Sequence, residues 1–94
     1  MNLDKSKKRI AKRVKMGFKG YPEISISYAG SNSDSAEEVV IIFIEKEGSS
    51  PMEERFKSKF DAREDEVIQS AIVKMIERSE AKTVTQAEEI SIKP

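Results

Sequence analysis

Six consecutive apolar residues, Val39-Val-Ile-Ile-Phe-Ile44, place the strongest constraint on how this chain can fold. Five of them are β-branched and one is aromatic, a composition typical of β-strands. Because successive strand residues point to opposite faces, the run presents apolar side chains on both faces. Such a strand belongs in the middle of a sheet. The run is far too short to span a bilayer, so no membrane association is expected.

Two periodic segments precede this strand. Residues 3–18 carry one apolar stripe at helical spacing, formed by Leu3, Ile10, Val14 and Phe18. Asn2 or Asp4 can cap the start of this helix, and the pattern ends at Gly17 and Gly20. In residues 23–28 apolar and polar residues alternate, which predicts a half-buried strand.

Residues 52–60 fit two structures. Met52, Phe56 and Phe60 lie four residues apart, as in a helix, and Ser50-Pro-Met-Glu53 resembles a helix start. However, residues 55–60 alternate charged residues with apolar or small ones, as in a strand with one wet face. A third strand would cover an edge of residues 39–44, because a two-stranded sheet is marginal alone. We therefore predict a strand here, with the helix as the alternative.

The last clear element is a helix near the C-terminus. Its apolar stripe consists of Ile68, Ala71, Ile72, Met75 and Ile76. Asp61 and Glu64 have the spacing of a capping box, and Lys74, Arg78 and Lys82 favour the end of the helix electrostatically. Residues 83–94 form a C-terminal tail with a weak alternation at Ile90 and Ile92, either a short strand or disordered.

The predicted fold is a single α+β domain over residues 1–82, with the element order α-β-β-β-α. A three-stranded antiparallel sheet carries two helices packed on one face. The apolar positions expected to be mostly buried are Leu3, Ile10, Val14, Ile24, Ile26, Tyr28, Val40, Ile42, Ile44, Phe56, Phe60, Ile68, Ile72, Met75 and Ile76.

The composition excludes several kinds of chemistry. The 94-residue chain has no Cys and no His, which removes disulfides, thiol nucleophiles and the commonest general base and metal ligand. The acidic residues at 61–66 match no calcium loop and suit helix capping. We therefore expect a cytoplasmic, non-enzymatic protein without a cofactor, a metal or a small-molecule ligand.

Charge is sorted along the chain. Residues 1–20 hold eight Lys or Arg residues and one Asp, whereas residues 21–54 hold one Lys and eight acids. An asymmetry of this kind can mark a surface for an anionic partner. On the first helix, lysines spaced by three and four residues predict one cationic face. Such a face could bind the phosphate backbone of a nucleic acid. The residues assigned to this face are Lys5, Lys8, Lys12, Lys15 and Lys19, with Arg9 and Arg13 beside them. An ordinary solvated helix face is the alternative.

A second candidate surface lies on the strand at residues 39–44. If Val40, Ile42 and Ile44 meet the helices, the opposite face of the sheet exposes Val39, Ile41 and Phe43. An exposed apolar patch usually marks a partner site. The alternative to RNA binding is therefore a homodimeric protein-interaction domain that associates through these three residues.

Four segments resemble the ribosome hibernation-promoting, or sigma-modulation, family in order and length. They are Lys7–Phe18, Pro22-Glu-Ile-Ser-Ile-Ser27, Val39–Glu47, and Glu64-Asp-Glu66 with Ala71-Ile-Val-Lys-Met-Ile-Glu-Arg78. The likeness covers residues 10–85 and does not include the strand that precedes the basic helix in that family. It implies an α+β domain that associates with the ribosome through its basic first helix.

Overall fold

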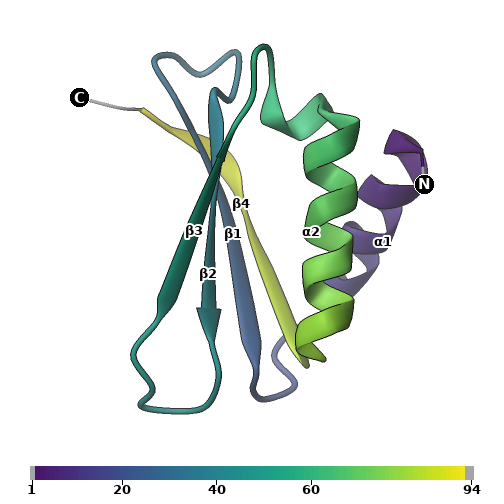
Figure 1. The fold of residues 1–94 in the computed structure, drawn as a ribbon, viewed down its shortest axis with the longest axis vertical. Coiled ribbons are helices and arrows are strands. Elements are labelled where there is room, and N and C mark those ends of the chain that lie inside the picture. The colour runs from purple at the N-terminus through teal and green to yellow at the C-terminus, as the bar shows by residue number, and fades with distance from the viewer. Residues whose placement is uncertain (1, 93–94) are drawn as a thin grey trace.

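The structure, a computed structural model, describes residues 2–92. It contains two long helices, α1 (Leu3–Lys15) and α2 (Glu66–Ser79), and a short 3₁₀ turn, η1 (Ala62–Glu64). The strands are β1 (Glu23–Gly30), β2 (Glu38–Ile44), β3 (Met52–Lys57) and β4 (Thr83–Ile92). The four strands form one sheet in the order β3-β2-β1-β4. Both helices pack on one face of this sheet and leave the other face open (Figure 1).

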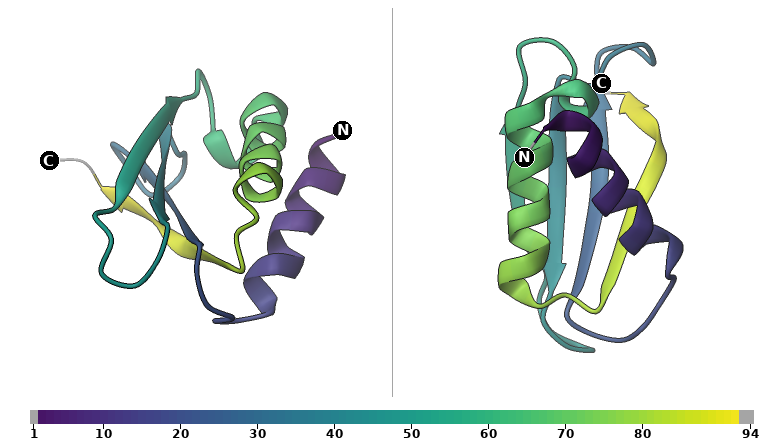
Figure 2. Two further views of the ribbon diagram at one scale, coloured as in Figure 1. Left: turned by 60° about the horizontal axis from the view of Figure 1, so that its bottom comes forward. Right: turned by 90° about the vertical axis from the view of Figure 1, so that its right-hand side faces the viewer.

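The α+β class and the two helices on one face are confirmed, but the sheet is larger than predicted. β1, β2 and β3 form the expected antiparallel meander. The segment at residues 83–92 lies in the predicted tail, for which a short strand and disorder were the alternatives. It is a ten-residue strand that pairs in parallel with β1. α2 carries the chain from the β3 edge to the β4 edge across the helix side (Figure 2). The sheet is therefore mixed, with β1 and β2 in the middle.

The ambiguous segment is a strand. Residues Met52–Lys57 pair antiparallel with β2 in a continuous register from Phe43↔Met52 to Glu38↔Lys57. The helical alternative for this segment is wrong. Because the strand ends at Lys57, Phe60 lies in the following turn and is 60% exposed, so its predicted burial is also wrong.

Local side-chain caps fix both helices. Asn2 accepts a hydrogen bond from the Lys5 amide at 2.9 Å and caps the start of α1. Of the two predicted caps, Asn2 and Asp4, Asn2 is therefore the correct one. The cap of α2 is Asp65, which accepts from the amides of Val67 and Ile68. Asp61, predicted for this role, caps η1 instead and leaves Asp65 to begin the helix.

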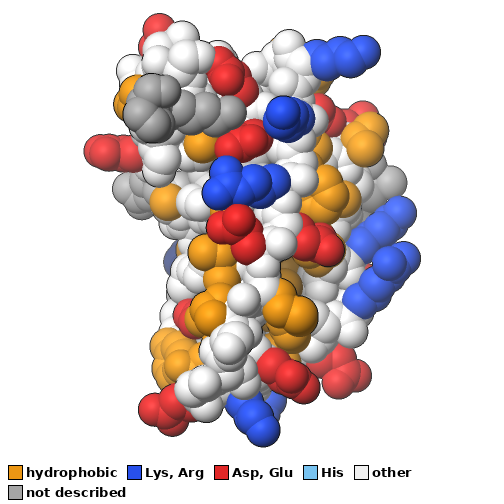
Figure 3. Space-filling view, turned by 60° about the vertical axis from the view of Figure 1, so that its left-hand side comes forward, with side chains coloured by type: hydrophobic (Ala, Val, Ile, Leu, Met, Phe, Trp, Pro, Cys, Tyr) orange, Lys and Arg blue, Asp and Glu red, His pale blue; other side chains and the backbone are white. Residues whose placement is uncertain are grey.

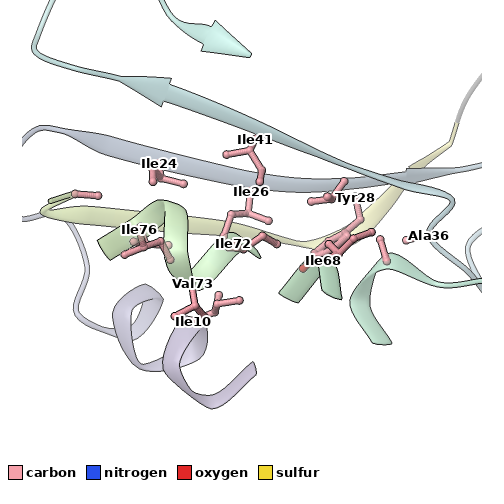
Figure 4. Close-up of a cluster of buried hydrophobic side chains, with 14 residues drawn as sticks. Ile10, Ile24, Ile26, Tyr28, Ala36, Ile41, Ile68, Ile72, Val73 and Ile76 are labelled. Atoms are coloured by element: carbon pink, nitrogen blue, oxygen red, sulfur yellow. The ribbon is translucent and has the colours of Figure 1, made fainter. Parts of the chain in front are cut away.

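The core lies between the sheet and the two helices. Figure 4 shows Ile24, Ile26 and Ile41 of the sheet facing Ile72 of α2, with Ile10 of α1 on the helix side of the cluster. Each of these side chains is at most 2% exposed. The periodicity predicted the burial of Ile10, Ile24, Ile26, Tyr28, Ile68, Ile72 and Ile76 correctly, but not that of Ile41. It missed Ala36, Ala62, Val73, Ala81 and Val84.

The two faces of β2 are the reverse of the prediction. Residues directly opposite in an antiparallel pair share a face, and Val39, Ile41 and Phe43 lie opposite Tyr28, Ile26 and Ile24. Val39 and Ile41 are therefore buried under the helices, and Phe43 packs against the same cluster. The proposed interface of Val39, Ile41 and Phe43 is wrong, because these side chains form the core rather than an exposed patch.

The other side of β2 faces away from the helices. Val40, Ile42 and Ile44 point to the open face of the sheet, where Ile42 and Ile44 are half-buried rather than core residues. Val40 is 9% exposed but lies outside the main core cluster. Of the remaining predicted core positions, Val14, Phe56 and Met75 are partly buried against the cluster, and Leu3 is half-buried.

Candidate nucleic-acid interface

α1 is held against α2 along a narrow seam. Ser6 is fully buried there, and its hydroxyl lies 3.2 Å from the hydroxyl of Ser70 on α2. Ile10 follows one turn later and enters the core. Small side chains let the two helices approach closely, so α1 has a fixed orientation. The side of α1 opposite Ser6 and Ile10 consequently faces solvent.

Four lysines occupy this solvent side, and we call Lys5, Lys8, Lys12 and Lys15 the lysine face. All four side chains are exposed. Among the side chains that the structure describes, none of these ammonium groups lies within ion-pair distance of a carboxylate, although five such pairs occur elsewhere. The lysine face is therefore a local concentration of positive charge without an ion-pair partner, on a chain whose net charge is zero.

The two arginines that were assigned beside the lysines have structural partners. Arg9 pairs with Glu77 of α2, with Nη1 and Oε1 separated by 3.3 Å. The guanidinium of Arg13 donates to the carbonyl oxygen of Ala81, just beyond the end of α2. Both side chains therefore point along the α1–α2 seam and fasten the two helices together.

Lys19 does not belong to the helix. α1 ends at Lys15, and Gly17 and Gly20 adopt φ angles of 74° and 107°, which turn the chain toward β1. The backbone amide of Lys19 donates to Thr83 Oγ1 at 2.8 Å, and that hydroxyl donates to the Gly20 carbonyl at 2.7 Å. Lys19 is exposed, but it lies in a connection fastened to β4 rather than on the helical face.

A groove of about 670 Å³ opens beside the lysine face, between α1 and β4. Lys8 belongs to both, and Lys7 and Arg63 add two more cations to the groove. These two are neutralised, because Lys7 Nζ lies 2.6 Å from Glu64 Oε1 and Arg63 pairs with Asp61 at 2.7 Å. The groove was not predicted, since its walls come from residues far apart in the sequence.

Three side chains from different elements form a hydrogen-bonded network at this groove. Gln69 Nε2 donates to the Tyr28 hydroxyl at 3.0 Å and to the Ala62 carbonyl at 2.9 Å. The Tyr28 hydroxyl donates to Gln86 Oε1 at 3.1 Å. Because Tyr28 and Gln69 are buried, this network satisfies polar groups that would otherwise be costly in the interior.

Burial raises the pKa of the Tyr28 phenol above its ordinary value of 10.0, and the hydrogen bond from Gln69 only partly opposes this effect. As the pH rises, Tyr28 therefore loses its phenolic proton first in the unfolded chain. The contribution of Tyr28 to the free energy of unfolding should be constant below pH ~10 and should fall as the pH rises toward the folded-state pKa. We expect tyrosinate absorbance in a Tyr21→Phe variant, where Tyr28 is the remaining tyrosine, to rise at a higher pH in the folded protein than in denaturant. Equal midpoints in the two states would contradict the buried network.

The acidic residues around η1 serve as structural groups. Asp61 binds the side chain of Arg63, which holds the pKa of its carboxyl below the ordinary value. Asp65 accepts from the Ser58 hydroxyl at 3.0 Å in addition to capping α2. Across the described part of the chain, no three acidic side chains gather as metal ligands would. In the same residues, neither helix is long and apolar enough to cross a membrane.

Comparison with models of known protein families, with curated proteins and with solved structures gives no match. The site must therefore be interpreted from its own geometry.

Proposed function

We propose that this protein is a non-enzymatic module that binds RNA through the lysine face of α1. The observation that carries the proposal is the set of four exposed, unpaired lysines on a helix whose two arginines are both engaged with α2 or the chain just after it. When an exposed ammonium group neutralises a phosphate, counterions condensed on the RNA are released, and no protein contact is broken.

The geometry favours contacts with the phosphate backbone rather than with bases. Residues spaced by three and four on α1 form a row about 15 Å long, since the helix rises about 1.5 Å per residue. The nearest aromatic pair, Phe18 and Tyr21, packs edge to face with ring centres 5.6 Å apart, so the two rings already contact each other. We therefore propose binding that depends little on base sequence.

The resemblance to the ribosome hibernation-promoting family supports ribosomal RNA as the first RNA to test. In this proposal the α1 surface contacts the phosphates of the ribosome, and the sheet serves as the scaffold that orients it.

A salt series tests the proposal directly. With four lysines contacting single-stranded RNA, the slope of log K against log salt should be about −3, because each contact contributes roughly −0.7. Two RNAs of the same length and unrelated sequence should bind with affinities that agree within a few-fold. Fluorescence anisotropy of labelled RNA, measured from low to physiological salt, gives both quantities. Absence of binding at low salt, to free RNA and to ribosomes alike, would contradict the proposal.

A further inference from the structure

β3 is an open edge of the sheet. It is the outermost strand, and all of its residues except Phe56 are exposed. The Ser58 amide donates to the Glu37 carbonyl at 2.8 Å, which fixes the phase of the hydrogen-bond ladder between β2 and β3. Since hydrogen-bonded and non-bonded pairs alternate along an antiparallel ladder, the backbone N–H and C=O groups of Glu53, Arg55 and Lys57 point outward.

No bulge, proline or helix blocks this edge in the described structure. The pairing of β3 with β2 has no bulge, Met52–Lys57 contains no proline, and neither helix covers the outer side of the strand. The opposite edge differs, because β4 has an irregular register against β1 between Ile26 and Tyr28. Irregular pairing hinders the addition of another strand, whereas a regular edge is a template for one.

We propose that β3 pairs antiparallel with β3 of a second copy of this chain, forming a two-fold dimer with a continuous eight-stranded sheet. The order of charged residues along the strand supports a second copy as the partner. In an antiparallel register centred on Glu54, Glu53 of each copy lies opposite Arg55 of the other copy. Cross-strand pairs of opposite charge stabilise a sheet. The same register directs the outward backbone groups of Glu53 to those of Arg55 in the second copy.

The apolar side chains fit the same register. Met52 and Phe56 lie on the helix side of β3, opposite Phe43 and Val39 of β2, and Met52 is 60% exposed. In the dimer, Met52 of each copy faces Phe56 of the other. Next to them lies a groove of about 670 Å³ between β3 and α2, whose apolar walls include Phe43 and Met75. Figure 3 brings forward the side of the molecule on which Figure 1 draws β3, and it shows hydrophobic side chains gathered among charged ones there.

The register centred on Arg55 is less favourable. It pairs Glu53 with Lys57 but places the two Arg55 side chains opposite each other and Glu54 opposite Phe56. The register centred on Glu54 instead places two glutamates opposite each other, and Arg78 lies in the same groove as Glu54. Arg55 itself already contacts Glu53 at 3.1 Å and the buried Glu38 at 3.0 Å, and its five donors can also reach Glu53 of the second copy.

The test measures mass by sedimentation equilibrium over a wide concentration range, without RNA, so its outcome is independent of RNA binding. We expect the wild type to dimerise and Glu53→Pro to be monomeric. The proline removes an amide that points outward, so the ladder with β2 stays intact. Glu53→Ala is the matched control, since it removes the charge but keeps the amide, and it should weaken dimerisation only about tenfold.

A second variant guards against misfolding of the proline variant. Glu53→Arg places an arginine opposite Arg55 of the second copy at both ends of the interface, so it should also give a monomer. Because the side chain of residue 53 is exposed, the circular dichroism spectrum should be unchanged. A wild type that stays monomeric at millimolar concentration would overturn the proposal. So would a dimer that tolerates both Glu53→Pro and Glu53→Arg, because its interface would then lie elsewhere, such as the open face around Ile42 and Ile44.

Discussion

Changing Lys8, Lys12 and Lys15 together to Glu is expected to abolish RNA binding while the fold is kept. The three side chains are exposed and have no carboxylate partner among the described residues, so their replacement breaks no ion pair of the folded chain. Each lost phosphate contact removes about 0.7 from the salt slope on single-stranded RNA, and three reversed charges also repel the phosphates. Anisotropy titration at low salt should show a loss of at least about a hundredfold in affinity.

A variant with the same change in net charge separates the lysine face from a general charge effect. Lys46, Lys59 and Lys74 are exposed and lie outside α1, so replacing all three by Glu removes equal charge from other surfaces. This control should keep most of the affinity of the wild type. If both triple variants lose affinity equally, binding follows net charge and the lysine face is an ordinary solvated helix surface.

Replacing Ile72 by Ala is expected to give a large loss of stability. Ile72 has no exposed surface and lies in the middle of α2, where it packs into the cluster formed with the sheet (Figure 4). Truncating a fully packed isoleucine leaves a cavity and costs about 2–5 kcal/mol of unfolding free energy. Urea unfolding followed by circular dichroism measures this change.

Val67 on the same helix provides the matched comparison. It is 78% exposed, so Val67→Ala removes methyl groups without opening a cavity and should change stability by less than about 0.5 kcal/mol. A loss below about 1 kcal/mol for Ile72→Ala would mean that α2 does not pack on the sheet as described.

Local periodicity was sufficient to predict the two helices and the strands β1 and β2, whereas β3 also required the argument that β2 needs a second neighbour. Periodicity could not orient β2. Residues 39–44 are apolar at both odd and even positions, so the sequence does not show whether Val39 or Val40 faces the helices. The register with β1 decides between them, because it places Val39 opposite Tyr28, whose own strand alternates clearly. Pairing between strands is a long-range property, and a strand that is apolar on both faces carries no signal for it.

β4 and the candidate site show the same limit. Residues 83–92 include Gln86 and Glu89 and alternate weakly, so their strand structure depends on the neighbouring β1 rather than on local preference. The exposure of the lysine face followed from the helical stripe alone. The roles of Arg9 and Arg13 did not, because they depend on which side of α1 meets α2.

The parallel pairing of β1 with β4 also has a consequence for the order of folding. Glu23 pairs with Thr83, so a central strand acquires its second neighbour only after the whole crossover through α2 is in place. Contacts between such distant segments form late, whereas the meander of β1, β2 and β3 can form early. A fragment that stops after α2 would retain every residue of the lysine face, and yet it would leave the edge of β1 that faces β4 unpaired. Loss of RNA binding by such a fragment would therefore report incomplete folding rather than a missing phosphate contact.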